Sequence, residues 1–335
     1  MKNEIENTVA ISEESKKEMQ LGNIFTPYAA NERRKLYEPN AYQSAKFVHY
    51  TSAEAALSII NSRQIWLRNT TCMSDYREVQ HGFSMLQKFF DNKSNLDDFT
   101  SALEVCAPGV AKEGIDLFNA WWSDTQSQTF IASVSVHDDK TEDEHGRLSM
   151  WHAFGGNNPR VALVFNVPWA SEATSALSLM FSPVAYFGEN EVYAEIRNVI
   201  QNIRGNSAFL NSVDRTRILA HVFNMLVAGA VCLKHEGFRE EREWRIIYAP
   251  NRRPSSLMKF NTEIIGGVPQ IIYKAPLDGT AGAMDLPNMF DRLIIGPSQY
   301  YLAMYQAFAD ALSKAGVSEE EVKKRIVFSG ITIRS

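Results

Sequence analysis

The chain has 335 residues, of which 45% are hydrophobic and 22% charged, and its 34 basic and 39 acidic residues give a net charge of −5. This composition is typical of a globular protein, and its acidic balance argues against a general polyanion binder. Cys72, Cys106 and Cys232 lie far apart and form no CxxC pair, which indicates a reducing compartment. No apolar run of the sequence reaches the length needed to span a membrane, and the polar start lacks the core of a signal peptide. We therefore expect a cytoplasmic protein with no membrane partner.

The first part of the chain predicts a tail followed by the start of a folded domain. Residues 1–44 carry scattered charges and few large apolar side chains, so we expect a tail with one short helix at most. A strand over 46–51 leads into a helix over 53–63, which Thr51 or Ser52 can cap.

The rest of the chain mixes strands and helices at irregular spacing. Alternating or β-branched apolar runs predict strands near 129–136, 161–167 and 242–248, and longer patterns predict helices near 189–204 and 213–236. This order favours one α+β domain over 45–335 with a mixed, strongly bent β-sheet and surrounding helices. The sequence contains no Walker loop, no GxGxxG and no GxSxG motif.

The stretch Lys234–Tyr248 (KHEGFREEREWRIIY) is the most informative segment for function. In a strand, Glu241, Glu243 and Arg245 would share one face, and Trp244 would point to the other. Carboxylates crowded in this way are candidates for binding ribose hydroxyls, a metal or a developing cation. A half-buried strand with an ion-paired solvent face fits the alternation equally well.

Other candidate residues stand at strand ends or on polar strand faces. His49 and Tyr50 close the first strand, and Ser133 and Ser135 place two hydroxyls on one face of a later strand. Trp151 precedes a glycine-rich turn. The concave site that we expect from these positions is lined by His49, Ser135, Trp151, Glu241, Glu243 and Arg245.

Metal-ligand spacing is present but does not predict a metal site. Asp75, Glu78 and His81 lie three residues apart on a predicted helix, and Glu78-x-x-His81 has the spacing of half a di-iron carboxylate site. Helix capping by Asp75 and a solvated Glu78 explain the same residues. A second pair, Glu142-x-x-His145, falls within the charged segment 137–147, which we expect to form a mobile flap beside the concave site.

Several segments, taken in order, resemble the DUF2971 proteins, an uncharacterised bacterial family. They are HYTSAEAALSIINSRQIWL, MSDYRE, FIASVS, LSMWHAFGGNNPRVALVF, KHEGFREEREWRIIY and LIIGPS, and they run from about residue 46 to about residue 300. The run from Lys234 to Ile247 is the most specific of them. The resemblance implies no function.

The order of the polar residues also resembles that of the ADP-ribosyltransferase superfamily. Its members have a split mixed β core, with His or Arg on the first strand and a catalytic Glu on a late strand. Some carry S-x-S on a middle strand and E-x-E late. Here His49, the pair Ser133 and Ser135, and the pair Glu241 and Glu243 occur in that order.

This second resemblance implies an enzyme that uses NAD as its substrate, in a toxin or phage-defence role. Glu243 would stabilise the ribosyl cation, Glu241 would orient or deprotonate a protein or nucleic-acid acceptor, and His49 would hold a ribose hydroxyl. Tyr50 or Trp151 would stack on the base or the nicotinamide ring. The NAD-binding residues expected on this basis are His49, Tyr50, Ser133, Ser135, Trp151 and Arg245.

Two other classes of function stay open at this point. A non-catalytic sensor or defence protein would bind a nucleotide or a partner in the same cleft without turnover. A metal-dependent hydrolase would use Asp75, Glu78 and His81 together with the glutamate pair. Nicotinamide release, binding without turnover and inhibition by a chelator distinguish the three classes.

Overall fold

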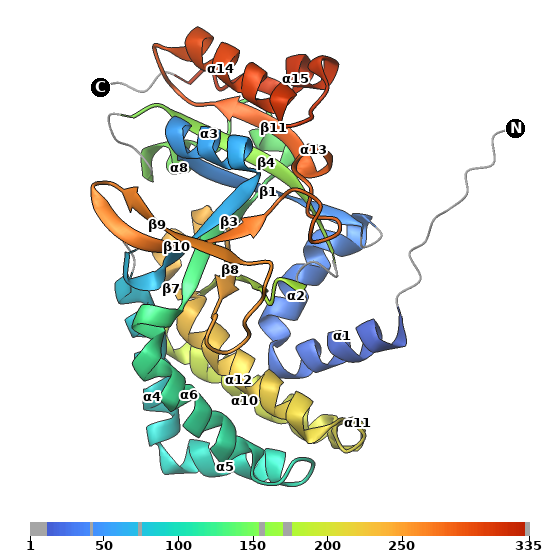
Figure 1. Ribbon diagram of the computed structural model, residues 1–335. Coiled ribbons are helices and arrows are strands. Elements are labelled where there is room, and N and C mark those ends of the chain that lie inside the picture. Colours follow the sequence, from blue (N-terminus) through green and yellow to red (C-terminus); the bar gives the residue numbers. More distant parts are fainter. Residues whose placement is uncertain (1–11, 41–42, 73–75, 154–157, 170–175, 332–335) are drawn as a thin grey trace, which may run out of the picture. The chain divides into compact units, whose positions relative to one another are not determined.

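The computed structural model describes residues 12–40, 43–72, 76–153, 158–169 and 176–331. The chain divides into two compact units, each made of three separate stretches (Figure 1). The helical unit comprises Met1–Gln43, Met73–Ser127 and Ser182–Arg239, and the sheet unit comprises Ser44–Cys72, Gln128–Phe181 and Glu240–Ser335. Both units take residues from the range 45–335, for which the sequence predicts a single domain.

Helices form most of the helical unit. They are α1 (Glu13–Phe25), α2 (Pro27–Tyr37), the 3₁₀ helix η1 (Glu38–Asn40), α4 (Tyr76–Asp91), α5 (Lys93–Glu104), α6 (Val110–Gln128), α10 (Glu189–Gly205), α11 (Ser207–Leu210) and α12 (Arg215–Val231). Two short strands, β6 (Ala185–Tyr186) and β7 (Leu233–Lys234), pair in parallel. Helices α4 and α12 approach closely at Gly82, where a Cβ would clash with the carbonyl oxygens of Gly229 and Ala230. A side chain at that position would force the two helices apart.

The prediction of a tail over residues 1–44 is wrong for residues 13–37. Ser12 caps α1 through a side-chain hydrogen bond to the backbone N–H of Ser15, and Pro27 stands at the start of α2. Helix α1 buries Leu21, Ile24 and Phe25. These few apolar residues fall on one stripe, so a segment of low average hydrophobicity still packs as an ordered helix.

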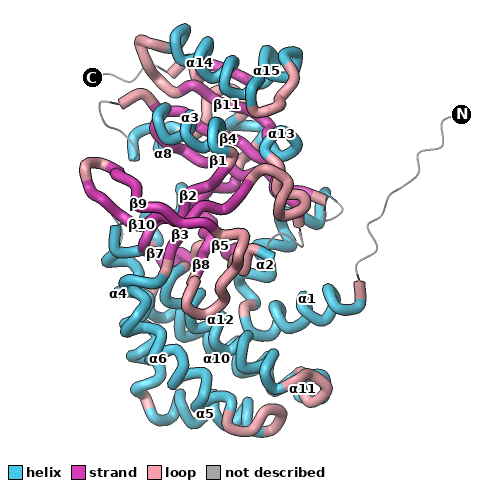
Figure 2. The backbone as a smooth tube through the Cα atoms, viewed as in Figure 1, coloured by secondary structure: helices cyan, strands magenta, loops and turns pink. Residues whose placement is uncertain are grey.

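A ten-stranded mixed sheet organises the sheet unit (Figure 2). Its strands are β1 (Ser44–Ser52), β2 (Gln64–Asn69), β3 (Phe130–Val136), β4 (Arg160–Pro168), β5 (Met180–Pro183), β8 (Glu243–Tyr248), β9 (Lys259–Ile265), β10 (Val268–Pro276), β11 (Phe290–Ile295) and β12 (Ile326–Phe328). The main path runs β12-β11-β4-β1-β3-β2-β10-β9, while β8 pairs with β3 and with β5. Only β11 and β12 pair in parallel along this path, so the predicted α+β class with a mixed sheet is confirmed.

The sheet divides into two branches at β3. One edge of β3 is occupied by β8 from Phe130 to Ser135. The other edge pairs with β1 only at Val136 and Ser135, and with β2 only at Ile131 and Phe130. Strands β1 and β2 therefore leave β3 in different branches, with residues 132–134 between them.

Helices cover both faces of the sheet unit. They are α3 (Ala53–Ser62), η2 (Thr70–Cys72), α7 (Asp139–Glu142), α8 (Leu148–Ala153), α13 (Leu286–Met289), α14 (Tyr301–Lys314) and α15 (Glu319–Arg325). The larger core packs side chains of α3 and α14 against Leu163 and Leu293, whereas the smaller one packs α8 against Val48 and Val164. Because Leu163 and Val164 are consecutive strand residues, these two cores lie on opposite faces of the sheet.

Most predicted elements are present, with differences at their ends. The strands expected near 46–51, 129–136, 161–167 and 242–248 correspond to β1, β3, β4 and β8. The charged segment 137–147 contains the short helix α7. No helix within the described ranges is both long enough and apolar enough to cross a membrane.

Candidate functional site

The carboxylate of Glu243 is held by side chains from two neighbouring strands. Pairing of β3 with β8 sets Ser133 opposite Arg245 and Ser135 opposite Glu243. Ser133 Oγ donates a hydrogen bond to Glu243 Oε1 at 2.5 Å. Arg245 donates from Nε to the same oxygen at 2.8 Å and from Nη2 to Oε2 at 3.2 Å. The guanidinium balances a carboxylate charge that would be costly to bury alone.

Strand alternation separates this polar group from an apolar face, as the sequence predicts. Ile246 and Tyr248 pack with the larger core. Trp244 meets the ring of Phe47 at 5.3 Å. On the other face, Glu243 is 6% exposed and Arg245 is 2% exposed. The polar face of β8 is therefore buried in the protein and is not a solvent face.

The expectation that Glu241 shares this face is wrong. The strand begins at Glu243, whereas Glu241 ends the 3₁₀ helix η3 (Glu236–Glu241). Between them, Arg242 has a left-handed backbone with φ of 44°. Because this conformation breaks strand alternation, the spacing of two residues no longer places both carboxylates on one face.

His49 contacts the same strand from the opposite face of the sheet. Val48 pairs with Ser135, which pairs with Glu243, so Val48 and Glu243 share a face and the next residue, His49, points the other way. His49 Nδ1 lies 2.9 Å from the carbonyl oxygen of Ser133, within the gap between the two branches. Burial lowers the pKa of His49, and this hydrogen bond opposes the shift. The expected common cleft for His49 and Glu243 is therefore not formed; Ser133 links them across the sheet.

Tyr50 and Trp151 pack against each other and not around an open site. Their rings meet edge to face at 4.9 Å, and the two residues are 5% and 2% exposed. The Tyr50 hydroxyl accepts a hydrogen bond from the Arg147 backbone N–H at 2.7 Å, and Trp151 Nε1 donates to the carbonyl of His145 at 2.8 Å. Both rings belong to the smaller core. Neither ring is exposed enough for the predicted stacking on a base.

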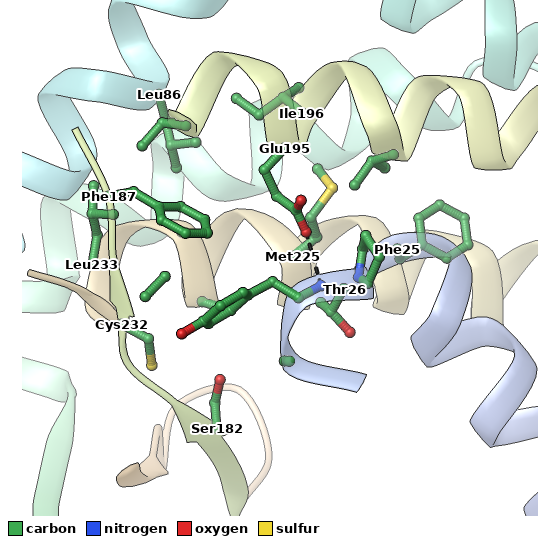
Figure 3. Close-up of a pocket in the computed structure, with 18 of the residues that line it drawn as sticks. Phe25, Thr26, Leu86, Ser182, Phe187, Glu195, Ile196, Met225, Cys232 and Leu233 are labelled. Carbon is green, nitrogen blue, oxygen red and sulfur yellow. Dashed lines mark hydrogen bonds between the residues drawn. The ribbon is translucent and has the colours of Figure 1, made fainter. Parts of the chain in front are cut away.

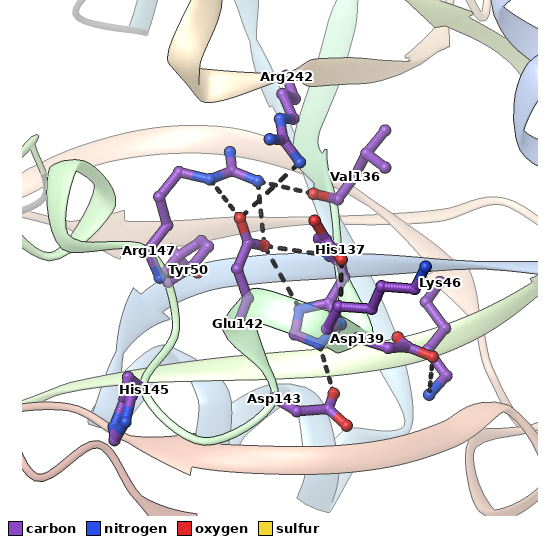
Figure 4. Close-up of polar contacts among 12 residues, drawn as sticks. Lys46, Tyr50, Val136, His137, Asp139, Glu142, Asp143, His145, Arg147 and Arg242 are labelled. Carbon is purple, nitrogen blue, oxygen red and sulfur yellow. Dashed lines mark hydrogen bonds and ion pairs between the residues drawn. The ribbon is translucent and has the colours of Figure 1, made fainter.

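Arg147 is not among the candidate residues from the sequence. Its side chain holds the charged segment 137–147 against the end of β3 and the residues before β8 (Figure 4). Its guanidinium donates to Glu142 Oε1 at 2.9 Å and to the carbonyl oxygens of Val136, Glu240 and Glu241 at 2.7–2.9 Å. The planar fork of an arginine suits such convergent acceptors. These contacts favour a fixed segment over the expected mobile flap.

The described residues contain one group with the composition of a metal site. His137, Asp139 and Asp143 place possible ligand atoms within 4.8 Å of one another. Lys46 Nζ already lies 2.9 Å from Asp139, and Arg292 Nη2 lies 2.9 Å from Asp143. These cations satisfy the carboxylates, so the group acts as an ion-pair network.

The other predicted metal ligands do not assemble into a site among the described residues. Glu78 forms an ion pair with the buried Lys234 at 3.3 Å. His81 is exposed on α4, and Asp75 lies outside the described residues.

Comparison with known proteins gives one relationship. Residues 150–246 match the model of DUF2971, a family of proteins of unknown function. The DUF2971 match includes Trp151, β4 and the part of β8 that carries Glu243 and Arg245. No curated protein and no solved structure shows significant similarity to the chain.

Proposed function

We propose that the protein uses NAD and acts on the bond between ribose and nicotinamide, with Glu243 as the catalytic carboxylate. In this reaction the bond from the ribose C1′ to the nicotinamide nitrogen breaks, and nicotinamide leaves with the electron pair. Water or an acceptor group of a protein or nucleic acid then attacks C1′ and loses a proton. Positive charge builds on the sugar in between, and a fixed carboxylate stabilises it.

The hydrogen bond from Ser133 Oγ to Glu243 Oε1 is the observation that carries this proposal. It ties Ser133 of the S-x-S pattern to Glu243, the second glutamate of the E-x-E pattern, and the ADP-ribosyltransferase resemblance associates these two positions with one active site. A carboxylate fixed by neighbouring donors needs little reorganisation when charge develops next to it. The branching of the sheet at β3 also agrees with the split core of that superfamily. His49 would act from the gap between the branches, through the Ser133 backbone, and Glu241 has no assigned step.

A binding protein without turnover is the second candidate, and the ion pair itself favours it. Arg245 already neutralises Glu243, and the two residues are 2% and 6% exposed. A carboxylate that serves only to complete a buried ion pair needs no substrate. In that case NAD or another nucleotide would either bind without being cleaved or not bind at all.

Nicotinamide release from NAD by the purified full-length chain separates the two candidates. The matched variants are Glu243→Gln and Glu240→Gln, the second at an exposed glutamate three residues upstream. Loss of the catalytic charge should lower release about 10²–10³-fold in Glu243→Gln and leave Glu240→Gln unchanged. Because Glu243→Gln also breaks a buried ion pair, unfolding of each variant is measured in parallel, and Ser133→Ala serves as the milder variant. No release by the unaltered protein with protein, RNA and DNA acceptors, or equal release by Glu243→Gln, excludes the NAD proposal.

A further inference from the structure

A cavity in the helical unit is lined by none of the residues around Glu243 (Figure 3). It has a volume of about 110 Å³ and lies between the α1–α2 junction, helices α4, α10 and α12, and the segment around β6. Its wall includes Phe25, Leu86, Phe187, Met225 and Leu233. Helices whose apolar sides converge in this way form the kind of concave, largely apolar pocket that binds small molecules.

Glu195 is the single formally charged residue among those that line this cavity in the described part of the helical unit. It projects from α10, and its Oε1 accepts a hydrogen bond from the backbone N–H of Tyr28 at 2.8 Å. Among the described residues, its Oε2 accepts one long hydrogen bond, from Asn198 Nδ2 at 3.5 Å. An ionised carboxylate can accept about four hydrogen bonds. Glu195 therefore has acceptor capacity left for a donor inside the cavity.

Aromatic rings accompany this carboxylate. Tyr28 and Phe187 both line the cavity, and their rings meet edge to face at 4.9 Å. Burial raises the pKa of Tyr28 to about 12, so its phenol stays neutral at physiological pH, and it donates to the carbonyl of Val184 at 3.2 Å. Aromatic faces together with a carboxylate attract an ammonium group, while the remaining wall accepts hydrocarbon.

The size of the cavity limits the ligand. A cavity of about 150 Å³ in another protein holds benzene, so a cavity of this size suits one ring or a short chain. We propose that the cavity binds a small apolar primary amine, with the hydrocarbon against Leu86 and Phe187 and the ammonium directed to Glu195. A purely apolar guest would leave Glu195 unused, and an acidic one would be repelled by it.

The test uses n-butylamine as the probe, with n-pentane and butyrate as neutral and anionic probes of similar size. Binding to the full-length protein is followed by ligand-observed NMR and calorimetry. The amine should bind most tightly and the acid least tightly. Glu195→Gln keeps an acceptor oxygen for Tyr28. It should weaken binding of the amine about tenfold, which corresponds to about 1.4 kcal/mol, and leave binding of n-pentane unchanged. Glu189→Gln, at an exposed glutamate on the same helix, should change neither.

A cavity-filling variant locates the bound probe. Ala228 lines the cavity from α12 and is partly exposed. Ala228→Leu should therefore fill part of the cavity without overpacking the buried core. It should weaken binding of the amine and of n-pentane about equally, and thermal unfolding without ligand checks that each variant is folded. No saturable amine binding at millimolar concentration, an amine affinity untouched by Ala228→Leu, or equal affinity for amine and acid would each overturn the proposal.

Discussion

The Ser133 hydroxyl lies 2.5 Å from Glu243 Oε1, although 110 residues separate the two in the chain. Antiparallel pairing of β3 with β8 brings them together, and Arg245 supplies a second donor to the same oxygen. The position of the carboxylate is therefore determined by two strands and not by β8 alone. Any function of Glu243 depends on this arrangement.

Ser133→Ala should destabilise the protein by about 1.5–3 kcal/mol, because it removes a hydrogen bond to a buried charged group. Ser133→Thr retains a hydroxyl and should recover most of this loss. Urea unfolding monitored by circular dichroism measures both variants. Equal free energies of unfolding for Ser133→Ala and the unaltered protein would mean that this hydrogen bond contributes nothing to stability.

Arg245→Met should cost about 3–5 kcal/mol, since it leaves the Glu243 carboxylate buried without its cation. Adding Glu243→Leu should restore part of the stability, because the unpaired charge is then removed as well. The control is the exposed pair Lys314 and Asp310, whose side chains are 73% and 62% exposed. Lys314→Met should cost only about 0.3–0.5 kcal/mol. A double-mutant cycle by urea unfolding gives the coupling energy, and a value near zero for Arg245 and Glu243 contradicts this account.

The pH dependence of stability should include a contribution from His49. Its pKa in the folded protein lies below the usual histidine value of 6.5, mainly because burial disfavours the charged ring. The unfolded chain therefore binds the proton more readily, and stability from this group is complete above pH 6.5 and falls as the pH drops below it. His49→Gln should flatten the stability curve below pH 6.5, because glutamine has no ring to protonate. Parallel curves for His49→Gln and the unaltered protein would assign the acid sensitivity to other groups.

The sequence predicts strands β1, β3, β4 and β8 because these strands carry local signals. Apolar alternation places Trp244 and Ile246 on one face and Glu243 with Arg245 on the other, and the structure agrees. It also indicates β1 and β4 to within about two residues, which is the usual error of element ends. Local periodicity therefore indicates four of the ten strands of the sheet, namely β1, β3, β4 and β8.

Features that depend on tertiary packing are not predicted by local sequence patterns. The left-handed backbone of Arg242 removes Glu241 from the face of Glu243. Glycine is the usual residue in this conformation, so an arginine gives no sequence signal for it. Likewise, Tyr50 and Trp151 look like free aromatic rings in the sequence but bury each other in the fold. The cavity beside Glu195 draws on helices far apart in the chain, so no single motif could indicate it.

Gly296 occupies a position where any side chain must displace its neighbours. A Cβ there would lie 2.9 Å from the carbonyl oxygen of Arg160 and 2.9 Å from Trp151 Cζ3. The backbone N–H of Gly296 also donates to that carbonyl at 2.9 Å, so the strand cannot retreat without losing the bond. Gly296→Ala should therefore cost about 1–3 kcal/mol through overpacking.

Gly22, within α1, is the matched control, because its Cβ would meet nothing within 4 Å. Gly22→Ala should instead stabilise the protein by about 0.5–1 kcal/mol, since alanine loses less backbone entropy in a helix. Urea unfolding of both variants tests the opposite signs, and a neutral Gly296→Ala would show that Trp151 has room to move.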